Sequence, residues 1–364
     1  MNRDAFSARL ARIRPADAAA MDAARRRQAQ LAKPPGSLGE LETISIRLAG
    51  ITGSVYNEIE KTRIYVLAAD NGVVAEGVSS APQSVTRQQA VNLTRGVTGA
   101  SAIAQHFGDE LVVVDVGIAQ EYTCPQIVNR RIARGTKNIA KEPAMTVQQA
   151  LTALDTGMTL AAQAGRDGVQ ALGVGEMGIG NTTTSAAVLA ALTGCAVEDA
   201  VGRGGGVTDE ALARKRAVVA GALAQWKPDA NDPVDVLAKV GGFDLAAMTG
   251  VFLGAAESRL PVVIDGFISI VAALCAVRLC PAAREFLFAS HGSFERGYAV
   301  AAQALALTPV LTLGMRLGEG SGCPLGFRVL EAACAAMNGM ATFDEARIDD
   351  GYLAPIRAQD AFTV

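Results

Sequence analysis

The sequence predicts an α/β protein whose core is an open parallel sheet flanked by helices, in a Rossmann-like three-layer arrangement. Half of the 364 residues are hydrophobic and 38 are Gly, which is typical of a well-buried α/β chain. Short apolar runs alternate with helical patterns, and no hairpin signal joins two of these runs. Strands separated by helices form βαβ units with right-handed crossovers, and such units build a parallel sheet.

The first 60 residues contain no strand pattern, so we expect them to form a helical appendage. Residues 16–32 are rich in Ala and Arg with helical spacing. The stretch Lys33-Pro-Pro-Gly-Ser-Leu-Gly39 then ends that helix. We expect Ser37 to cap a second helix, which runs through Leu41 and Leu48.

From Arg63 onwards, apolar runs predict six strands. The segment from Asn231 to Glu257 has no strong strand pattern, and we expect two helices there, around Gly241-Gly242. The predicted strands are Ile64–Ala69, Leu111–Val116, Val169–Val174, Val262–Ile264, Phe286–Ala289 and Val310–Leu313.

Each predicted strand ends in polar residues. A single Asp-Gly pair more often marks a turn than a site. Ligands of an open parallel sheet bind at the carboxyl ends of its strands, however, so the whole set favours a site at one edge. The polar strand ends are Asp70-Asn71-Gly72, Asp115, Glu176, Asp265-Gly266, Ser290-His291-Gly292 and Arg316 to Gly320.

The stretch Val169–Thr184 is the main glycine-rich motif. An apolar strand is followed by a turn with three glycines, and then by Asn181 and three Thr before an Ala-rich helix. A helix N-terminus attracts anions and glycines allow their close approach, so we interpret the stretch as a phosphate cradle. Two alternatives stay open. One is a turn without a ligand, and the other is a dinucleotide fingerprint in Gly173–Gly178, although the next acids, Glu198 and Asp199, follow no strand.

A second glycine-rich loop, Val201–Gly206, precedes Thr208, which we expect to cap a helix. Lys215 lies about two turns into that helix, where it is placed to reach a phosphate as a point charge. In the alternative interpretation, Lys215 is a solvated lysine between Arg214 and Arg216.

Four acids are expected to converge, namely Asp70, Glu176, Asp265 and Glu319. A carboxylate among apolar walls has a raised pKa and suits proton abstraction. Glu319 is the best candidate for a general base, because it lies on a glycine-flanked turn after the last apolar run. In the alternative, Arg316 pairs with Glu319 and makes it structural.

Composition and charge exclude several classes of protein. A net charge of −3 without a basic block argues against nucleic-acid binding. The apolar run Gly266–Val277 is too short to span a bilayer, and the N-terminus has no apolar signal core. With two His and six Cys lacking CxxC spacing, we expect no metal, no redox cofactor and free thiols in a reducing cytoplasm. A magnesium site among the acids and a hydrolase built on Ser290-His291 are weaker alternatives.

Seven motifs occur together and in order along the chain. They are Lys33-Pro-Pro-Gly-Ser-Leu-Gly39 with Leu41-Glu42, Asp70-x-Gly72-Val73, Gly175-Glu-Met-Gly-Ile-Gly-Asn-Thr-Thr183, Lys239-Val-Gly-Gly-Phe-Asp-Leu245, Met248-Thr-Gly250, Asp265-Gly-Phe267 and Arg316-Leu-Gly-Glu-Gly-Ser-Gly322. This ordered set closely resembles nicotinate-nucleotide–dimethylbenzimidazole phosphoribosyltransferase, the CobT family of cobalamin biosynthesis. The resemblance covers nearly the whole chain.

The resemblance implies that nicotinate mononucleotide and 5,6-dimethylbenzimidazole give α-ribazole 5′-phosphate and nicotinate, without a cofactor. It implies a homodimer, with a small helical domain of residues 1–60 and 325–364 and a large α/β catalytic domain of residues 61–324. It places the general base at Glu319, Glu176 near the ribose and Gln89 in the benzimidazole pocket. The residues that we expect to bind substrate are Gly178, Ile179, Gly180, Asn181, Thr182, Lys215, Gly202, Gly204, Gln89, Ala81, Ser290 and Leu317.

The chain departs from the family pattern at two positions. Asn71 stands where relatives carry His, and Ala81 stands where a Ser can line the base pocket. Both bear on which aromatic base is accepted, so a phosphoribosyltransferase for another aromatic base is one alternative. A nucleotide-dependent oxidoreductase using Gly173–Gly178 and a non-catalytic nucleotide-binding protein are the others.

Overall fold

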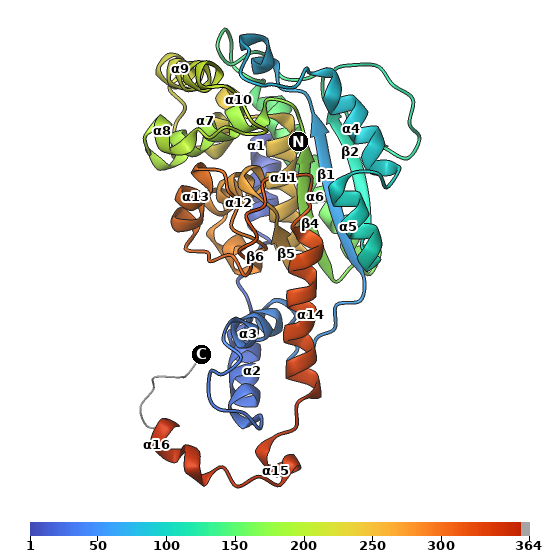
Figure 1. Cartoon of the computed structure of the whole chain (residues 1–364), viewed down its shortest axis with the longest axis vertical. Coiled ribbons are helices and arrows are strands. Elements are labelled where there is room, and N and C mark those ends of the chain that lie inside the picture. The colour runs from blue at the N-terminus through green and yellow to red at the C-terminus, as the bar shows by residue number, and fades with distance from the viewer. Residues whose placement is uncertain (358–364) are drawn as a thin grey trace.

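The computed structural model of the chain describes residues 1–357, and a six-stranded sheet forms its centre (Figure 1). All paired strands are parallel, in the order β3-β2-β1-β4-β5-β6, so their carboxyl ends share one edge. The prediction of an open parallel sheet flanked by helices is confirmed. The strands are β1 (Thr62–Ala69), β2 (Glu110–Gly117), β3 (Val128–Asn129), β4 (Ala171–Met177), β5 (Val262–Ile264) and β6 (Leu287–Ala289).

One predicted strand was wrong and one strand was missed. The run Val310–Leu313 forms only a single parallel bridge, between His291 and Leu311. Its last two residues are exposed, so the run leaves the sheet before a ladder can extend. The missed strand, β3, has two residues in a polar loop and therefore gives no apolar run.

Helices cover both faces of the sheet. On one face, the Tyr65 hydroxyl of β1 donates to the Leu160 carbonyl of α6 (Val147–Arg166). On the other face, a Cβ atom placed on Gly173 of β4 would lie 2.6 Å from the Cβ of Cys323, the first residue of α14 (Cys323–Gly339). Successive strand residues point to opposite faces, so the strands are buried on both sides.

Helices from both the N-terminal and the C-terminal part of the described chain lie together below the sheet in Figure 1. There α2 (Ala18–Gln30) packs against α3 (Glu40–Thr52), α3 packs against α14, and Leu31 pairs with Thr342. This arrangement supports our proposal of a small helical domain built from both ends. The first helix, α1 (Arg3–Leu10), packs instead on α6 and α11 (Phe243–Glu257) of the sheet part, where Arg9 pairs with Asp155 and Glu257.

The expected cap at Ser37 is not formed. Helix α3 begins after Gly39, which has a positive φ of 52° and no side-chain cap. The Glu42 carboxylate accepts from the Leu38 backbone N–H and forms a buried ion pair of 2.6 Å with Lys33. Glu42 and Lys33 therefore shape the turn that we had assigned to Ser37.

The two helices expected between residues 231 and 257 are confirmed as α10 (Pro233–Val240) and α11, and the Thr208 cap is confirmed by its bond from the Ala211 N–H. No helix within residues 1–357 combines the length and apolar character needed to cross a membrane. The other helical segments are η1 (Gly72–Glu76), α4 (Ser84–Thr94), α5 (Gly99–Phe107), α7 (Asn181–Thr193), α8 (Val197–Ala200), α9 (Asp209–Trp226), α12 (Phe267–Leu279), η2 (Pro281–Phe286), α13 (Gly297–Leu305), α15 (Phe343–Ala346), η3 (Gly351–Leu353) and α16 (Ala354–Arg357).

Candidate active site

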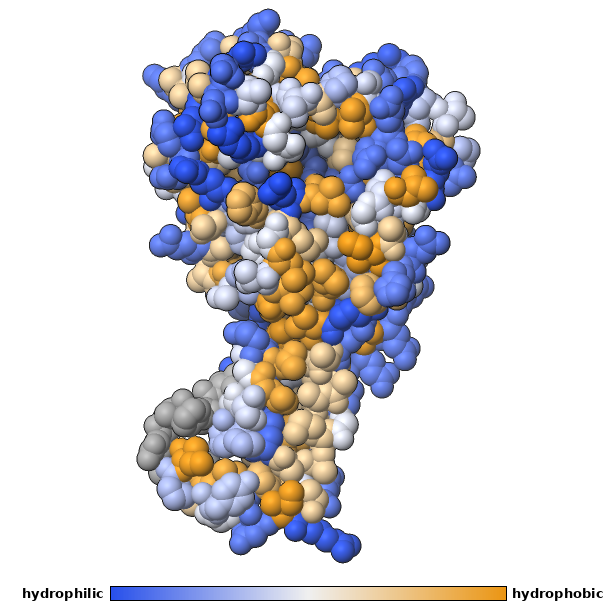
Figure 2. All heavy atoms as spheres, viewed as in Figure 1, coloured by the Kyte–Doolittle hydropathy of each residue, from blue (hydrophilic) through white to orange (hydrophobic). Residues whose placement is uncertain are grey.

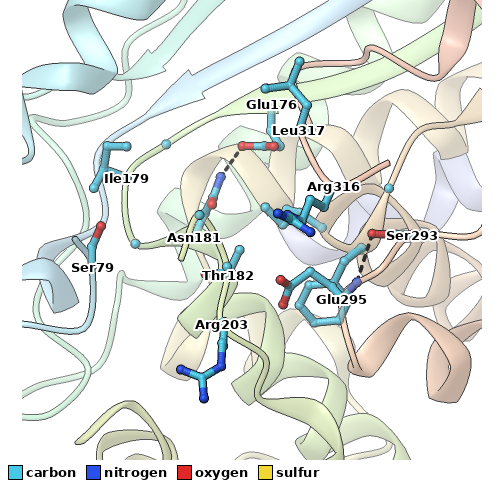
Figure 3. A pocket seen from close by; sticks show the side chains of 18 of the residues that line it. Ser79, Glu176, Ile179, Asn181, Thr182, Arg203, Ser293, Glu295, Arg316 and Leu317 are labelled. Atoms are coloured by element: carbon cyan, nitrogen blue, oxygen red, sulfur yellow. Dashed lines mark hydrogen bonds between the residues drawn. The ribbon is translucent and has the colours of Figure 1, made fainter. Parts of the chain in front are cut away.

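A cleft of about 1040 Å³, part of it open to solvent, lies at the carboxyl ends of the strands (Figure 3). Segments from six places in the chain line it, and most of the predicted substrate-binding residues are among them. The predicted residues on its wall are Ala81, Glu176, Gly178, Ile179, Gly180, Asn181, Thr182, Gly204 and Leu317.

The glycine turn after β4 forms one wall. Gly178 allows tight packing, because a Cβ atom there would lie 2.4 Å from the Ala69 carbonyl oxygen. Gly180 has φ 92° and precedes the first residue of α7. Within the described chain, no hydrogen bond engages the N–H groups of Gly180 and Thr182, so both are free for an anion. The Ile179 N–H is different, since it already donates to Thr86.

The dinucleotide interpretation of this stretch is not supported. Gly173 and Gly175 lie inside β4 and pack against the segment that follows Glu319, because a Cβ atom on Gly175 would lie 2.3 Å from the Gly320 nitrogen. They therefore cannot form the turn around a pyrophosphate. Glu198 and Asp199 belong to the short helix α8 and not to the end of a second strand.

Lys215 is buried behind the cleft wall, which excludes the solvated interpretation. Its Nζ donates to Thr182 Oγ1 at 2.8 Å and to the Gly202 carbonyl at 3.1 Å. Burial lowers the pKa of Lys215 to about 8, although the negative charge of Glu295 acts in the opposite direction and raises it. The ammonium group thus stands directly behind the turn whose N–H groups are free.

The second glycine loop meets the first. A Cβ atom on Gly204, which has φ 56°, would lie 2.8 Å from Thr182 Oγ1. Arg203 lies beside the cleft in Figure 3 and pairs with Asp209. Sequence reasoning did not select Arg203 or Glu295, because both stand in loops without a strand-end pattern.

Three of the four expected acids do converge, and a fourth was missed. Asp244, and not Asp70, is the fourth acid near Glu176. The charge of Asp70 interacts with that of Asp115 instead. Burial raises the pKa of Glu176 to about 8, with further contributions from the charges of Asp244, Asp265 and Glu319. Asp244 lies in the motif from Lys239 to Leu245. It was not selected from the sequence, because it stands at the start of a helix and not at the end of a predicted strand.

The Asn181 side chain links two of these acids. Its amide nitrogen donates to Glu176 and, at 3.1 Å, to Asp244 Oδ2. Asn71 also donates to Asp244 Oδ2, at 3.4 Å, and burial raises the pKa of Asp244 to about 6. Asn71, which departs from the family pattern, thus belongs to the hydrogen-bond network next to the glycine turn.

Glu319 stands on a strained turn with φ 63°. Its Oε1 accepts a hydrogen bond of 2.8 Å from Gln89, whereas Oε2 is buried and has no partner among the described residues. Asp265 holds the turn, because its two oxygens accept from the N–H groups of Gly320 and Gly322. Arg316 stacks over Phe294 and makes no ion pair with Glu319 within residues 1–357.

Two more polar groups stand at the strand ends. Ser290 is buried behind the cleft, where its hydroxyl donates to the Ile264 carbonyl at 2.7 Å. His291 lines the cleft, and its Nε2 lies 3.5 Å from Asp265. Burial lowers the pKa of His291, but its contacts with Asp265 outweigh this and hold the pKa above the usual value. No group of three or more His, Cys, Asp or Glu in the described part is arranged to hold a metal ion.

Another part of the cleft wall carries several apolar side chains beside the hydroxyl groups of Ser79 and Ser80. The apolar residues are Val78, Ala81 and Met177, and Leu317 reaches to the start of α5. Leu317 is 54% exposed, which leaves an apolar side chain ready to cover a ligand. The arrangement therefore combines a glycine turn with free N–H groups, buried carboxylates and several apolar side chains.

Comparisons with known proteins define the class. A family model described as phosphoribosyltransferase matches residues 13–348, which include the sheet and the cleft. Nicotinate-nucleotide–dimethylbenzimidazole phosphoribosyltransferase of Clostridium perfringens is 51% identical over 341 residues, 94% of each chain. The protein of that name from Roseiflexus is 48% identical and covers 94% of this chain and 98% of its own.

A solved structure gives the same result. The crystal structure of CobT from Thermus thermophilus has a TM-score of 0.88 and 44% identity to this chain, and covers 92% of this chain and 100% of its own. The chain belongs to the nicotinate-nucleotide–dimethylbenzimidazole phosphoribosyltransferase, or CobT, family of enzymes.

Proposed function

We propose that this enzyme transfers the phosphoribosyl group of nicotinate mononucleotide to 5,6-dimethylbenzimidazole, which gives α-ribazole 5′-phosphate and nicotinate for the nucleotide loop of cobalamin. One observation carries the proposal: a glycine turn with free N–H groups lines the cleft, and Glu319, whose buried Oε2 has no partner among the described residues, directly follows Gly318 of the same cleft wall. The family relationship supports the same substrates.

The phosphate would lie on the free N–H groups of Gly180 and Thr182, with Lys215 behind them as the charge. The free amides and the buried ammonium support this placement. The second glycine loop, with Gly202 and Gly204, closes the cradle from the other side. A doubly charged phosphate would also raise the pKa of Lys215 and keep it protonated.

Glu176 would lie beside the ribose. As nicotinate leaves, the electron pair of the bond between C1′ and the ring nitrogen goes to that nitrogen, which removes the positive charge of the ring. Positive charge then develops on the ribose, and a nearby carboxylate stabilises it. Because Glu176 holds its proton up to a pH near 8 in the free enzyme, the cationic nucleotide would favour its ionised form on binding.

Glu319 would act as the general base. The nitrogen of the benzimidazole attacks C1′ from the face opposite nicotinate, so the β-nucleotide gives an α-riboside in a single inverting step. The proton on the second ring nitrogen goes to Oε2 of Glu319, since Gln89 already occupies Oε1. General base catalysis of this kind contributes about 10²–10⁴-fold, and holding both rings in line supplies much of the rest.

The direct test is release of nicotinate, followed by chromatography with and without dimethylbenzimidazole. We expect release that depends on the base, together with a product that carries an α-glycosidic bond. Adenine, benzimidazole and a phenol in parallel reactions show whether Ala81 and Asn71 change the choice of base. Release without any base would indicate a hydrolase, and tight stoichiometric binding of NADH would indicate the oxidoreductase instead.

We also propose that the enzyme works as a homodimer in the cytoplasm. Six free thiols suit a reducing compartment. Figure 2 shows hydrophobic residues gathered where α14 leaves the sheet, and a large apolar patch on a protein surface favours association. Light scattering should give the mass of two chains, and a mass of one chain at micromolar concentration would contradict the dimer.

A further inference from the structure

Helix α4 (Ser84–Thr94) contacts both halves of the candidate active site. Thr86 and Gln89 are three residues apart, so they lie on the same face of the helix. Thr86 bonds to the nucleotide side of the cleft through Ile179. Gln89 bonds to the base side through Glu319. Helix α4 therefore connects the glycine turn with Glu319, and the proposed transfer reaction depends on the distance between these two groups.

Thr86 is fully buried, and its side-chain oxygen is used as a hydrogen-bond acceptor. The Oγ1 atom accepts a hydrogen bond of 3.0 Å from the Ile179 N–H. The Asp70 carboxyl group lies nearby, and its pKa is raised by burial and lowered by the Ala119 N–H and by Thr86. Oδ1 of Asp70 is buried without a hydrogen-bond partner among the described residues, and the Thr86 oxygen is the acceptor for the Ile179 N–H.

The position of Ile179 gives this bond its importance. Ile179 lies between Gly178 and Gly180, and glycines leave a turn with many accessible conformations. The two other backbone bonds of this turn, from Asn181 to Gly178 and from Thr183 to Gly180, close within the turn itself. The bond from Ile179 to Thr86 instead joins the backbone of the turn to a separate helix, which fixes where the free N–H groups point.

Resting on the proposed transfer reaction, we propose that Thr86 is a positioning residue that fixes the glycine turn 178–180 relative to Glu319 through helix α4. It acts through the backbone of Ile179 and does not touch the substrate. The turn presents the phosphate-binding N–H groups, so a turn held in register places C1′ of the nucleotide at a constant distance from the incoming base. A 1 Å misplacement at a reacting centre can lower a rate by about 10²-fold.

Thr86→Val tests the proposal, because it keeps the shape and removes the acceptor. Calorimetry should show the dissociation constant of nicotinate mononucleotide raised by about 5- to 150-fold, the effect of leaving one buried N–H without a partner. The Michaelis constant for dimethylbenzimidazole should change much less. Thr86→Ser keeps the hydroxyl and should restore nucleotide affinity to within about threefold.

Thr94→Val is the matched control. Thr94 lies at the end of the same helix, and its hydroxyl donates to the Val91 carbonyl away from the cleft. We expect wild-type affinity and turnover from this variant. Thr86→Ala serves if Thr86→Val does not fold, and urea unfolding of each variant separates a local effect from a global one.

The outcomes separate the two proposals. Nucleotide affinity of Thr86→Val within twofold of wild type, or equal losses in Thr86→Val and Thr86→Ser, overturns the positioning role. Calorimetry needs no turnover, so this result stands even if the wild-type enzyme uses another base. A wild-type enzyme that releases no nicotinate with any base overturns the proposed function instead.

Discussion

Glu176→Gln should remove most of the loss of stability that the enzyme shows between about pH 5 and pH 8. Burial, together with the charges of Asp244, Asp265 and Glu319, raises the pKa of Glu176 from 4.5 to about 8. The folded protein therefore keeps a proton that the unfolded chain has released. In that interval the unfolded state binds fewer protons, so the free energy of unfolding falls as pH rises.

The expected magnitude follows from the width of the interval. Each pH unit between the unfolded and folded pKa values of one group changes the free energy of unfolding by about 1.4 kcal/mol. Over the whole range from 4.5 to 8, the Glu176 contribution amounts to roughly 5 kcal/mol. Asp244, with a pKa raised to about 6, acts in the same direction but only below pH 6. Between pH 6 and pH 8, the change in the free energy of unfolding therefore comes from Glu176 and not from Asp244.

The measurement is urea unfolding at pH 6, 7 and 8. Fluorescence of Trp226, the single tryptophan of the chain, reports on the sheet part, where its indole N–H donates to the Ile139 carbonyl. Between pH 6 and pH 8, the free energy of unfolding of Glu176→Gln should rise by about 2–3 kcal/mol relative to that of wild type. Glu60→Gln, which changes an exposed carboxylate, is the matched control and should run parallel to wild type. A Glu176→Gln curve that also runs parallel to wild type would refute a raised pKa.

Three further predictions concern the site. Lys215→Ala should weaken nicotinate mononucleotide binding by about 1.5–3 kcal/mol in calorimetry, because a charge-assisted contact is lost. Arg214→Ala is the control, and an unchanged affinity in Lys215→Ala would show that Lys215 does not bind the phosphate. Glu319→Gln should lower kcat by about 10²–10⁴-fold and abolish the acidic limb of the pH–rate profile, with nucleotide affinity nearly unchanged. Near-normal kcat at neutral pH would make Glu319 structural. Activity should survive exhaustive EDTA treatment, and a loss that only a divalent ion restores would turn the strand-end acids into metal ligands.

The sheet could be predicted from the sequence because buried parallel strands are continuous apolar runs. Five of the six predicted runs are strands, and they carry the polar ends that build the cleft. The run Val310–Leu313 is apolar and yet does not form a strand. Apolar character indicates burial, but a ladder also needs a partner along the whole run, and here only Leu311 has one.

The site was predictable where chemistry follows a strand or a glycine turn. Glu176 and Asp265 were selected in this way, and the structure places both at the cleft. Asp244 begins a helix that only the tertiary fold carries to the same point. Glu295 and Arg203 stand in loops, whose positions depend on packing between distant segments. Side chains of this kind have no local pattern in the sequence.

The concentration of acids in the cleft has a consequence for the direction of the reaction. Glu176, Asp244, Asp265 and Glu319 lie close enough for their charges to interact, and no cation of the described chain pairs with Glu176 or Glu319. In the proposed reaction, a cationic pyridinium ring would offset the negative charge of the ionised acids and would favour the ionised form of Glu176, which keeps its proton in the free enzyme up to about pH 8. Once C1′ has been transferred, nicotinate would have lost that ring charge while keeping its own carboxylate. In the proposed reaction, the buried carboxylates would thus favour the charged nucleotide over neutral-ring nicotinate, which would promote release of the leaving group.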